Sequence, residues 1–214
     1  MQTTSDGDTL SARVSAFLQG LREVVAIRAV FVASAAEAVM YLGFGAFLGF
    51  LPIYAKTTGL NDAEIAIILG IQLTAAVVAK PIAGWVSDRS GRKPAIVVGL
   101  LLCAVALPLI FRAESFVALI ALVSLLGLGV ATVTPVTNAL IADVVATHRL
   151  GAGMGVFGTI WDVGEAAGPM IAGFLIGRFG FAWSFDAIAL TTAIAAAGFA
   201  MLVRGSGTRA DMRE

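Results

Sequence analysis

Four ionisable side chains stand inside long apolar stretches of this sequence, where water is scarce. Glu37 lies about nine residues into the first stretch, and Tyr41 follows on the same side of a helix. Asp162 and Glu165 are three residues apart in a later stretch, so their carboxyls would point to a similar side. Lys80 lies in the second stretch. Carboxyls at such depth can bind and release protons or attract a cation, and other ionisable groups there usually face a cavity. Glu37, Lys80, Asp162 and Glu165, together with Tyr41, are therefore candidates to bind a substrate or a proton.

Each charged candidate also has a structural interpretation. Lys80 is within about two turns of the end of its stretch, and its ammonium could extend to the membrane surface, which is the favoured interpretation. Glu37 is too deep for that and is favoured as a cavity residue. For Asp162 and Glu165, a gate and a second proton or cation site stay equally open. Asp186, about one turn into the last stretch, is expected at the interface.

The elements that must position these residues are membrane-spanning helices. Of the 214 residues, 59% are hydrophobic and 13% are charged, against about 25% charged residues in soluble domains. A membrane helix needs about 20 mostly apolar residues. Six stretches meet this condition and predict an all-α membrane protein: Ala29–Ala55, Ala63–Val86, Pro94–Phe111, Phe116–Ala142, Gly151–Gly177 and Ala182–Val203. Asn61 or Asp62 is expected to cap the second helix.

The segments outside the spans are short. Residues 1–28 form an N-terminal tail, in which Thr9–Ile27 has the apolar spacing of an amphipathic helix, either along the membrane surface or in a linker. The six-helix domain covers residues 29–204, and 205–214 form a second tail. Basic residues indicate that both tails are cytoplasmic, because ten would then lie on that side and only Lys56, Arg112 and Arg178 on the other.

Several function classes are excluded by composition. The formal net charge is zero, so no nucleic-acid partner is expected. Cys103 is the only cysteine, which excludes a disulfide framework and a cysteine-based metal site. The only histidine, His148, lies in a loop without a catalytic cluster at membrane depth, so an enzyme is not expected. No metal and no cofactor is predicted.

A charged stretch between the second and third apolar runs is the most specific motif. Gly84-x-x-x-Asp88-Arg89-x-Gly91-Arg92-Lys93 is expected to form a tight turn, with Gly91 permitting a left-handed backbone and Pro94 in the first turn of the next helix. This motif resembles the signature of the major facilitator superfamily. Leu51-Pro52-Ile53-Tyr54 is similar to the end of the first helix of a half in that family.

A second, looser match lies in the fifth run. Gly164-x-x-x-Gly168-Pro169-x-x-Ala172-Gly173 resembles the antiporter motif of the family's fifth helix, but has alanine at Ala172 where that motif has glycine. Its small residues would let helix backbones approach closely, and Pro169 could kink the helix. Close packing alone is the plainer interpretation, and a moving element beside Asp162 and Glu165 is the functional one.

The resemblance implies secondary active transport by alternating access. In that family, residues like Asp88 and Arg92 form a cytoplasmic latch that stabilises the outward-facing state. The latch would comprise Gly84, Asp88, Arg89, Gly91, Arg92 and Lys93. Asp143, at the end of the fourth run, is the expected partner of Arg92, because arginine and carboxylate pair directionally.

The length implies one half of such a transporter. Family members have two six-helix halves with the substrate between them, and each half contains two inverted three-helix repeats. This chain would be such a half, with the C-terminal half favoured over the N-terminal one, and would pair with a second half, either missing sequence or another copy. Its function would be proton-coupled efflux of a small molecule across the cell membrane, within membrane lipid. The alternative is a non-transporting scaffold or regulatory half that docks another membrane protein.

Overall fold

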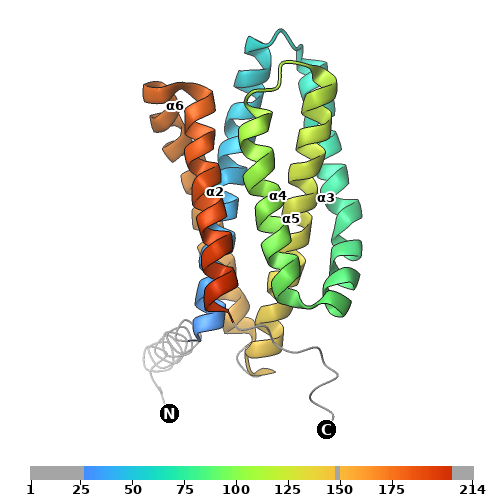
Figure 1. Cartoon of the computed structure of the whole chain (residues 1–214), viewed down its shortest axis with the longest axis vertical. Coiled ribbons are helices and arrows are strands. Elements are labelled where there is room, and N and C mark those ends of the chain that lie inside the picture. The colour runs from blue at the N-terminus through green and yellow to red at the C-terminus, as the bar shows by residue number, and fades with distance from the viewer. Residues whose placement is uncertain (1–26, 148–149, 204–214) are drawn as a thin grey trace, which may run out of the picture.

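The computed structural model describes residues 27–147 and 150–203, and every regular element in these two ranges is a helix. The amphipathic helix expected over Thr9–Ile27 therefore lies outside the described residues except for Ile27, as do His148, Arg149 and the tail at 205–214. Figure 1 labels the helices. Their bounds are α2 Arg28–Thr57, α3 Asp62–Ser90, α4 Arg92–Ile110, α5 Phe116–Val144 and α6 Leu150–Leu202.

The described ranges hold five helices long and apolar enough to cross a membrane, rather than the six predicted. The fifth and sixth apolar runs are joined in the 53-residue α6. Gly180 alone departs from helical geometry there, with φ 76° and ψ 175°, a conformation that glycine adopts readily. Beyond it the ribbon turns back toward the end of the bundle from which α6 came (Figure 1). The expected link at Arg178–Gly180 is thus a one-residue break instead of a loop.

Both ends of α3 depend on local hydrogen bonds. At its start, the Asn61 side chain accepts from the N–H groups of Ala63 and Glu64, while the Glu64 carboxylate accepts from the Asn61 N–H. This capping box confirms Asn61 as the cap. At its end, α3 continues through Ser90, so the tight turn predicted over Gly84–Lys93 shrinks to one non-helical residue, Gly91, with φ 94°. The charged residues on either side of Gly91 are therefore helical: Asp88 and Arg89 belong to the last turn of α3, and Arg92 and Lys93 to the first turn of α4.

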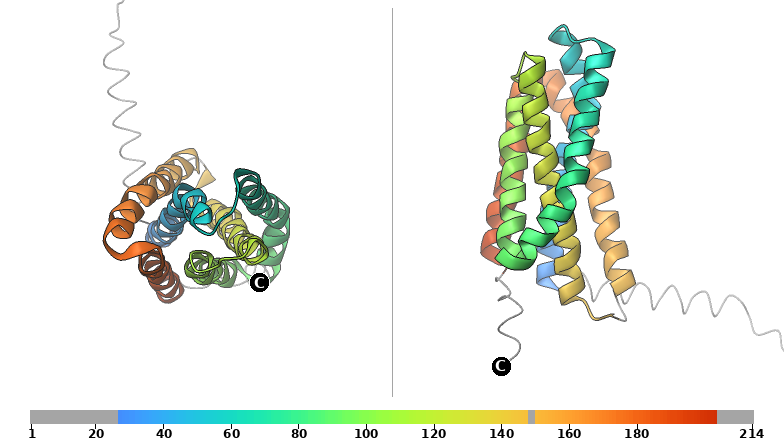
Figure 2. Two further views of the ribbon diagram at one scale, coloured as in Figure 1. Left: turned by 90° about the horizontal axis from the view of Figure 1, so that it is seen from above. Right: turned by 90° about the vertical axis from the view of Figure 1, so that its right-hand side faces the viewer.

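The helices pack as two close pairs joined by a third element. α2 lies against α6, α3 lies against α5, and α4 contacts both α5 and α6 (Figure 2). Most of the buried apolar side chains form one core cluster that draws on all five helices. The bundle therefore holds its shape through a continuous core, with α3 attached mainly through α5.

Backbone contact between α2 and α6 is the closest packing in this arrangement. A Cβ atom added at Gly164 would overlap the carbonyl oxygen of Ala38, and one at Gly168 would overlap that of Leu42. From the other side, a Cβ at Gly45 would overlap the Glu165 carbonyl oxygen. Small residues on both helices thus let the two backbones touch. Pro169 and Gly173 continue this contact, the first against Gly49 and the second against Phe50.

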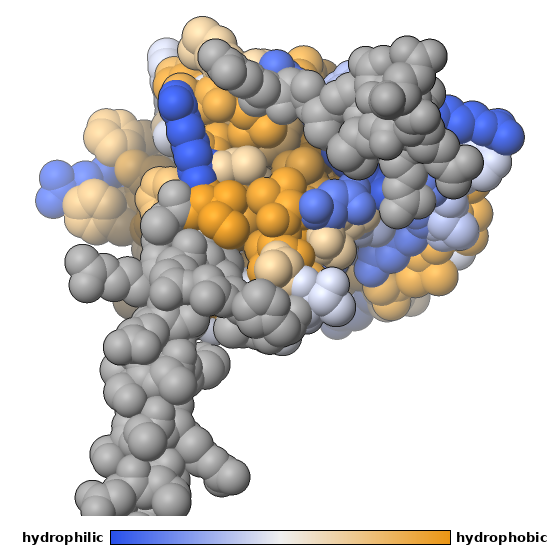
Figure 3. Space-filling model, turned by 90° about the horizontal axis from the view of Figure 1, so that it is seen from below, coloured by the Kyte–Doolittle hydropathy of each residue, from blue (hydrophilic) through white to orange (hydrophobic). Residues whose placement is uncertain are grey.

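The outer surface of the bundle is apolar. Leu73, Val117, Met170 and Trp183 each expose more than 60% of their surface. Seen from below, large apolar areas lie beside a few strongly hydrophilic side chains (Figure 3). Helices that expose apolar residues along their length fit a lipid environment, since lipid chains cover such surfaces and water does not.

The α2–α6 contact leads to a stability prediction. Gly164→Ala should destabilise the folded chain by about 1–3 kcal/mol, the usual cost of overpacking, because its methyl group would push α6 away from the Ala38 carbonyl. Thermal unfolding in detergent, followed by circular dichroism, measures the effect. Gly155→Ala is the matched control on the same helix, since nothing lies within 4 Å of a Cβ there. Equal melting temperatures for the two variants would contradict the proposed importance of this contact.

Candidate functional site

Glu37 lies at the centre of the candidate site, about a third of the way along α2. Its side chain is completely buried, and neither carboxyl oxygen has a hydrogen-bond partner among the described residues. The hydroxyls of Thr134 and Thr137 on α5 lie near it, but neither meets the geometry of a hydrogen bond. A charged carboxylate without a cation or donors is very costly to bury. The arrangement therefore fits the neutral, protonated form of Glu37.

Thr137 explains part of this geometry. Its hydroxyl donates to the Val133 carbonyl oxygen at 2.9 Å, one turn earlier in α5. That proton is thus already used, and toward Glu37 the Thr137 oxygen can only accept. A protonated Glu37 could supply such a hydrogen, whereas an ionised one could not.

Tyr41, one turn after Glu37 in α2, contacts the two neighbouring helices α5 and α6. Its hydroxyl lies 3.1 Å from the Thr134 hydroxyl oxygen on α5. Its ring packs on Trp161 of α6, with ring centroids 4.7 Å apart. Three helices therefore meet at this tyrosine, one turn from the buried carboxyl.

Asp162 and Glu165 line a separate hollow between α2 and α6, of about 600 Å³ and open on one side. Trp161 and Gly45 share its wall. Asp162 is exposed and Glu165 is partly buried, so the two carboxyls differ in their contact with the surroundings. Trp161 also packs on Tyr41, so one aromatic pair separates this hollow from the Glu37 site.

Lys80 lies apart from these carboxyls. Its side chain is exposed on α3, and no ion pair joins it to an acidic residue of the described ranges. The structure therefore brings Glu37 and Tyr41 together, places Asp162 and Glu165 beside them, and leaves Lys80 outside the group.

Sequence reasoning missed Thr134, Thr137 and Trp161. A signal for the threonines was present, because both stand in an apolar run beside Pro135, at the spacing that places them on one helix face. Trp161 adjoins Asp162 in the sequence, but only the packing of α6 on α2 brings it to Tyr41.

A second polar cluster, at the end of α3, surrounds Arg92. This guanidinium forms ion pairs with Asp88, one turn earlier, and with Asp143 on α5, where Nε lies 3.3 Å from Oδ2. It also donates to the Ser87 hydroxyl at 2.9 Å. Arg92 thus ties the end of α3 and the start of α4 to the end of α5. Ser87 was not anticipated from the sequence.

The other motif residues have different surroundings. The Arg89 guanidinium stacks on the ring of Trp85, 3.6 Å from its centroid, and Lys93 is half-buried without an ion-pair partner in the described ranges. At Gly84, a Cβ atom would meet nothing within 4 Å, so no close packing in this structure requires glycine there.

The opposite end of the bundle is closed by a different ion pair. Both terminal nitrogens of Arg112 donate to the two carboxylate oxygens of Asp186, one of them at 2.7 Å. Hydrogen bonding to Asp186 raises the pKa of Arg112. Asp186, which the sequence predicts at the interface, joins α6 to the turn after α4 through this pair. Stacked rings of Phe111 and Phe185, 3.4 Å apart, lie beneath it.

The isolation of Glu37 leads to a stability prediction. Glu37→Met should increase the free energy of unfolding by about 1–3 kcal/mol and so raise the melting temperature. The substitution keeps a similar side-chain volume but removes a buried polar group that has no partner among the described residues. Thermal unfolding in detergent is the measurement, and Glu114→Met, at an exposed loop position, is the control with little expected change. A marked loss of stability in Glu37→Met alone would mean that water or lipid satisfies the carboxyl.

Known proteins resemble part of this chain in sequence. The chain is 28% identical over 137 residues to the Quinolone resistance protein NorA of Staphylococcus aureus (strain MRSA252), covering 64% of this chain and 35% of that protein. It is 32% identical over 144 residues to the Uncharacterized MFS-type transporter MJ1560 of Methanocaldococcus jannaschii, covering 67% and 37%. The chain thus matches little more than a third of the length of these relatives.

Solved structures share the fold. The POT family transporter PepTSo superposes with a TM-score of 0.74 at 16% identity, over 85% of this chain and 39% of that one. The human organic anion transporter MFSD10 (TETRAN) gives 0.66 at 21% identity, over 83% and 47%. A family model described as Major Facilitator Superfamily matches residues 33–211, which make up most of the chain. The chain therefore belongs to the Major Facilitator Superfamily and is a multi-pass membrane protein.

Proposed function

We propose that this chain forms one six-helix half of a proton-coupled transporter that exports a small molecule by alternating access. The observation that carries the proposal is the carboxyl of Glu37, which is fully buried where α2, α5 and α6 meet and has no hydrogen-bond partner in the part of the chain that the structure describes. In this proposal α6 crosses the membrane twice, with its reversal at Gly180. The six spans are then two inverted three-helix repeats, α2 to α4 and α5 to the end of α6.

Glu37 would bind the coupling proton. While protonated, it can remain in its apolar surroundings without a cation. On losing the proton it needs several donors or water. Of the two hydroxyls near it, that of Thr137 already donates to the Val133 carbonyl oxygen, and that of Thr134 shares a hydrogen bond with Tyr41 in which either oxygen can donate, so at most one donor is left for the carboxylate. The ionised form would thus favour a different arrangement of α2 and α5, which shifts the population of conformations.

The hollow beside Trp161 is our candidate for substrate contact. Asp162 and Glu165 give it negative potential, while Leu48 and Pro169 give it apolar wall. A second six-helix unit facing this side would enclose the hollow, as in transporters whose substrate site lies between halves. The NorA relative is named for quinolone resistance, which supports efflux of a small amphipathic molecule.

The Arg92 cluster would act as the latch. The excess of basic residues at this end of the bundle supports a cytoplasmic position for the cluster and for both tails, in a chain that we assign to the cell membrane. Its ion pairs to Asp88 and Asp143 hold three helices in one arrangement. They would stabilise the outward-facing state and break as the cytoplasmic side opens.

The proton-binding part of this proposal is tested by Glu37→Gln. Glutamine has nearly the same shape but cannot gain or lose a proton, so transport driven by a proton gradient should be abolished while substrate exchange without a gradient persists. Both fluxes are measured in proteoliposomes with the complete transporter assembled. Glu114→Gln, at an exposed loop position, is the control for loss of one carboxylate. Full gradient-driven transport in Glu37→Gln would refute the assignment.

The latch is tested by exchanging its charges. Arg92→Asp and Asp143→Arg should each lower the transport rate, roughly tenfold if one partly buried pair is lost, and the double variant should recover much of it. Asp62→Arg, which breaks the exposed Lys56–Asp62 pair, should change little. If the double variant transports no better than either single one, the two residues do not act as a pair.

A further inference from the structure

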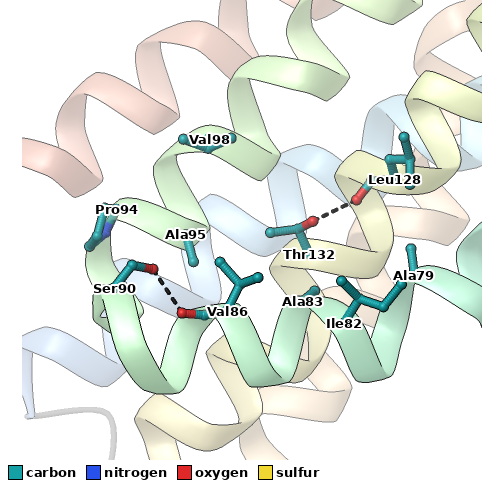
Figure 4. A pocket seen from close by; sticks show the side chains of 10 residues that line it. All are labelled: Ala79, Ile82, Ala83, Val86, Ser90, Pro94, Ala95, Val98, Leu128 and Thr132. Atoms are coloured by element: carbon teal, nitrogen blue, oxygen red, sulfur yellow. Dashed lines mark hydrogen bonds between the residues drawn. The ribbon is translucent and has the colours of Figure 1, made fainter.

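An apolar groove runs along the outside of the bundle where α3, α4 and α5 meet, away from Glu37 and the α2–α6 hollow. It has a volume of about 440 Å³. α3 contributes Ile82 and Val86, α4 contributes Val98, and α5 contributes Leu128 (Figure 4). All four of these side chains expose more than 40% of their surface, so the groove is open to its surroundings.

The two hydroxyls in the groove wall are not available to an occupant as donors. Ser90 donates to the Val86 carbonyl oxygen at 2.9 Å, and Thr132 donates to that of Leu128 at 2.7 Å (Figure 4). Both bonds stay within a single helix. The wall therefore offers apolar surface with its polar groups already satisfied, which suits a hydrocarbon chain.

The dimensions match one leaflet of a bilayer. The lining residues of α3 extend from Ala79 to Ser90, which is about 16 Å at 1.5 Å per residue. Half of a hydrocarbon core of about 30 Å is about 15 Å. The groove begins at the α3–α4 junction, where Ser90 and Pro94 lie, so a chain inside it would run from the membrane surface to the midplane.

Positive charge flanks the surface end of the groove. Arg89 stands two turns after Ile82, on the same face of α3, and Lys93 adjoins Pro94. Arg92 is neutralised by Asp88 and Asp143, whereas neither Arg89 nor Lys93 has an ion-pair partner in the described ranges. Trp85, over which Arg89 folds, is of the residue type that lies at the headgroup level.

We propose that this groove is a binding site for an anionic phospholipid, whose acyl chain fills the groove and whose phosphate contacts Arg89 and Lys93. The charge at its mouth distinguishes it from ordinary lipid-facing surface. A zwitterionic lipid of the same chain length fits the channel but carries no net charge for these two residues to attract. The site lies on another face than Glu37 and the α2–α6 hollow, and it uses Arg89 and Lys93 of the latch motif but not the Arg92 ion pairs. Its test measures lipid retention, so its outcome does not depend on transport.

The headgroup part is tested by native mass spectrometry of the purified full chain, titrated with phosphatidylglycerol or with phosphatidylcholine of identical chains. The chain should retain phosphatidylglycerol more strongly than phosphatidylcholine. In the double variant Arg89→Gln, Lys93→Gln, the ratio of phosphatidylglycerol to phosphatidylcholine retention should fall roughly tenfold. Arg178→Gln is the matched control, since Arg178 also stacks on an aromatic ring, Phe174, but at the other end of the bundle. Equal retention of both lipids by the unmodified chain, or an equal loss in Arg178→Gln, would overturn the proposal.

The acyl-chain part is tested by filling the groove. Val98→Phe should weaken retention of both lipids several-fold, because the ring occupies the channel. Val105→Phe is the control on the same helix, at a valine that exposes the same 53% of its surface but does not line the groove. Because both positions are exposed, both variants should fold, which circular dichroism checks. Unchanged retention in Val98→Phe would show that the lipid binds elsewhere.

Discussion

Direct backbone contact between α2 and α6 determines how the rest of the structure is arranged. Gly45, Gly164 and Gly168 bring the two helices close enough that no side chain separates them at these points. This contact places Trp161 on Tyr41 and sets Glu165 beside the wall of α2. With larger residues the helices would separate, and the aromatic pair between Glu37 and the open hollow would lose its packing. The geometry of the site therefore depends on glycine, which has no side chain, at these three positions.

Electrostatics divides the bundle into three levels. At each end, arginine–carboxylate pairs join helices that are distant in sequence: Arg92 with Asp143, and Arg112 with Asp186. Between them, Glu37 forms no ion pair and no hydrogen bond with any of the described residues. Charged pairs near the membrane surface keep partial access to water, so their desolvation cost is modest. A single carboxyl at the centre has no such access, which is why its protonation state and the helix arrangement are linked in our proposal.

The outer face follows a different principle. Its side chains are apolar and its hydroxyls bond within their own helices, as Ser90 and Thr132 do. Such a surface has no preference among lipid chains except where its shape and its flanking charges differ. The groove between α3, α4 and α5 differs in both respects, because it is a channel of one-leaflet length and because Arg89 and Lys93 flank its end.

The sequence by itself determined the all-helical membrane class, the positions of the apolar runs to within a few residues and the family, and it limited the cap of α3 to Asn61 or Asp62. Apolar length, capping residues and short motifs are properties of contiguous residues. The sequence also identified Glu37 as a buried carboxyl, since depth in an apolar run is readable from the chain. Only the tertiary structure decided that Thr134, Thr137 and Trp161 belong to the same site, that Arg112 pairs with Asp186, and that α6 is one element broken at Gly180. These features depend on which faces of separate helices meet, and helix periodicity fixes a face but not its partner.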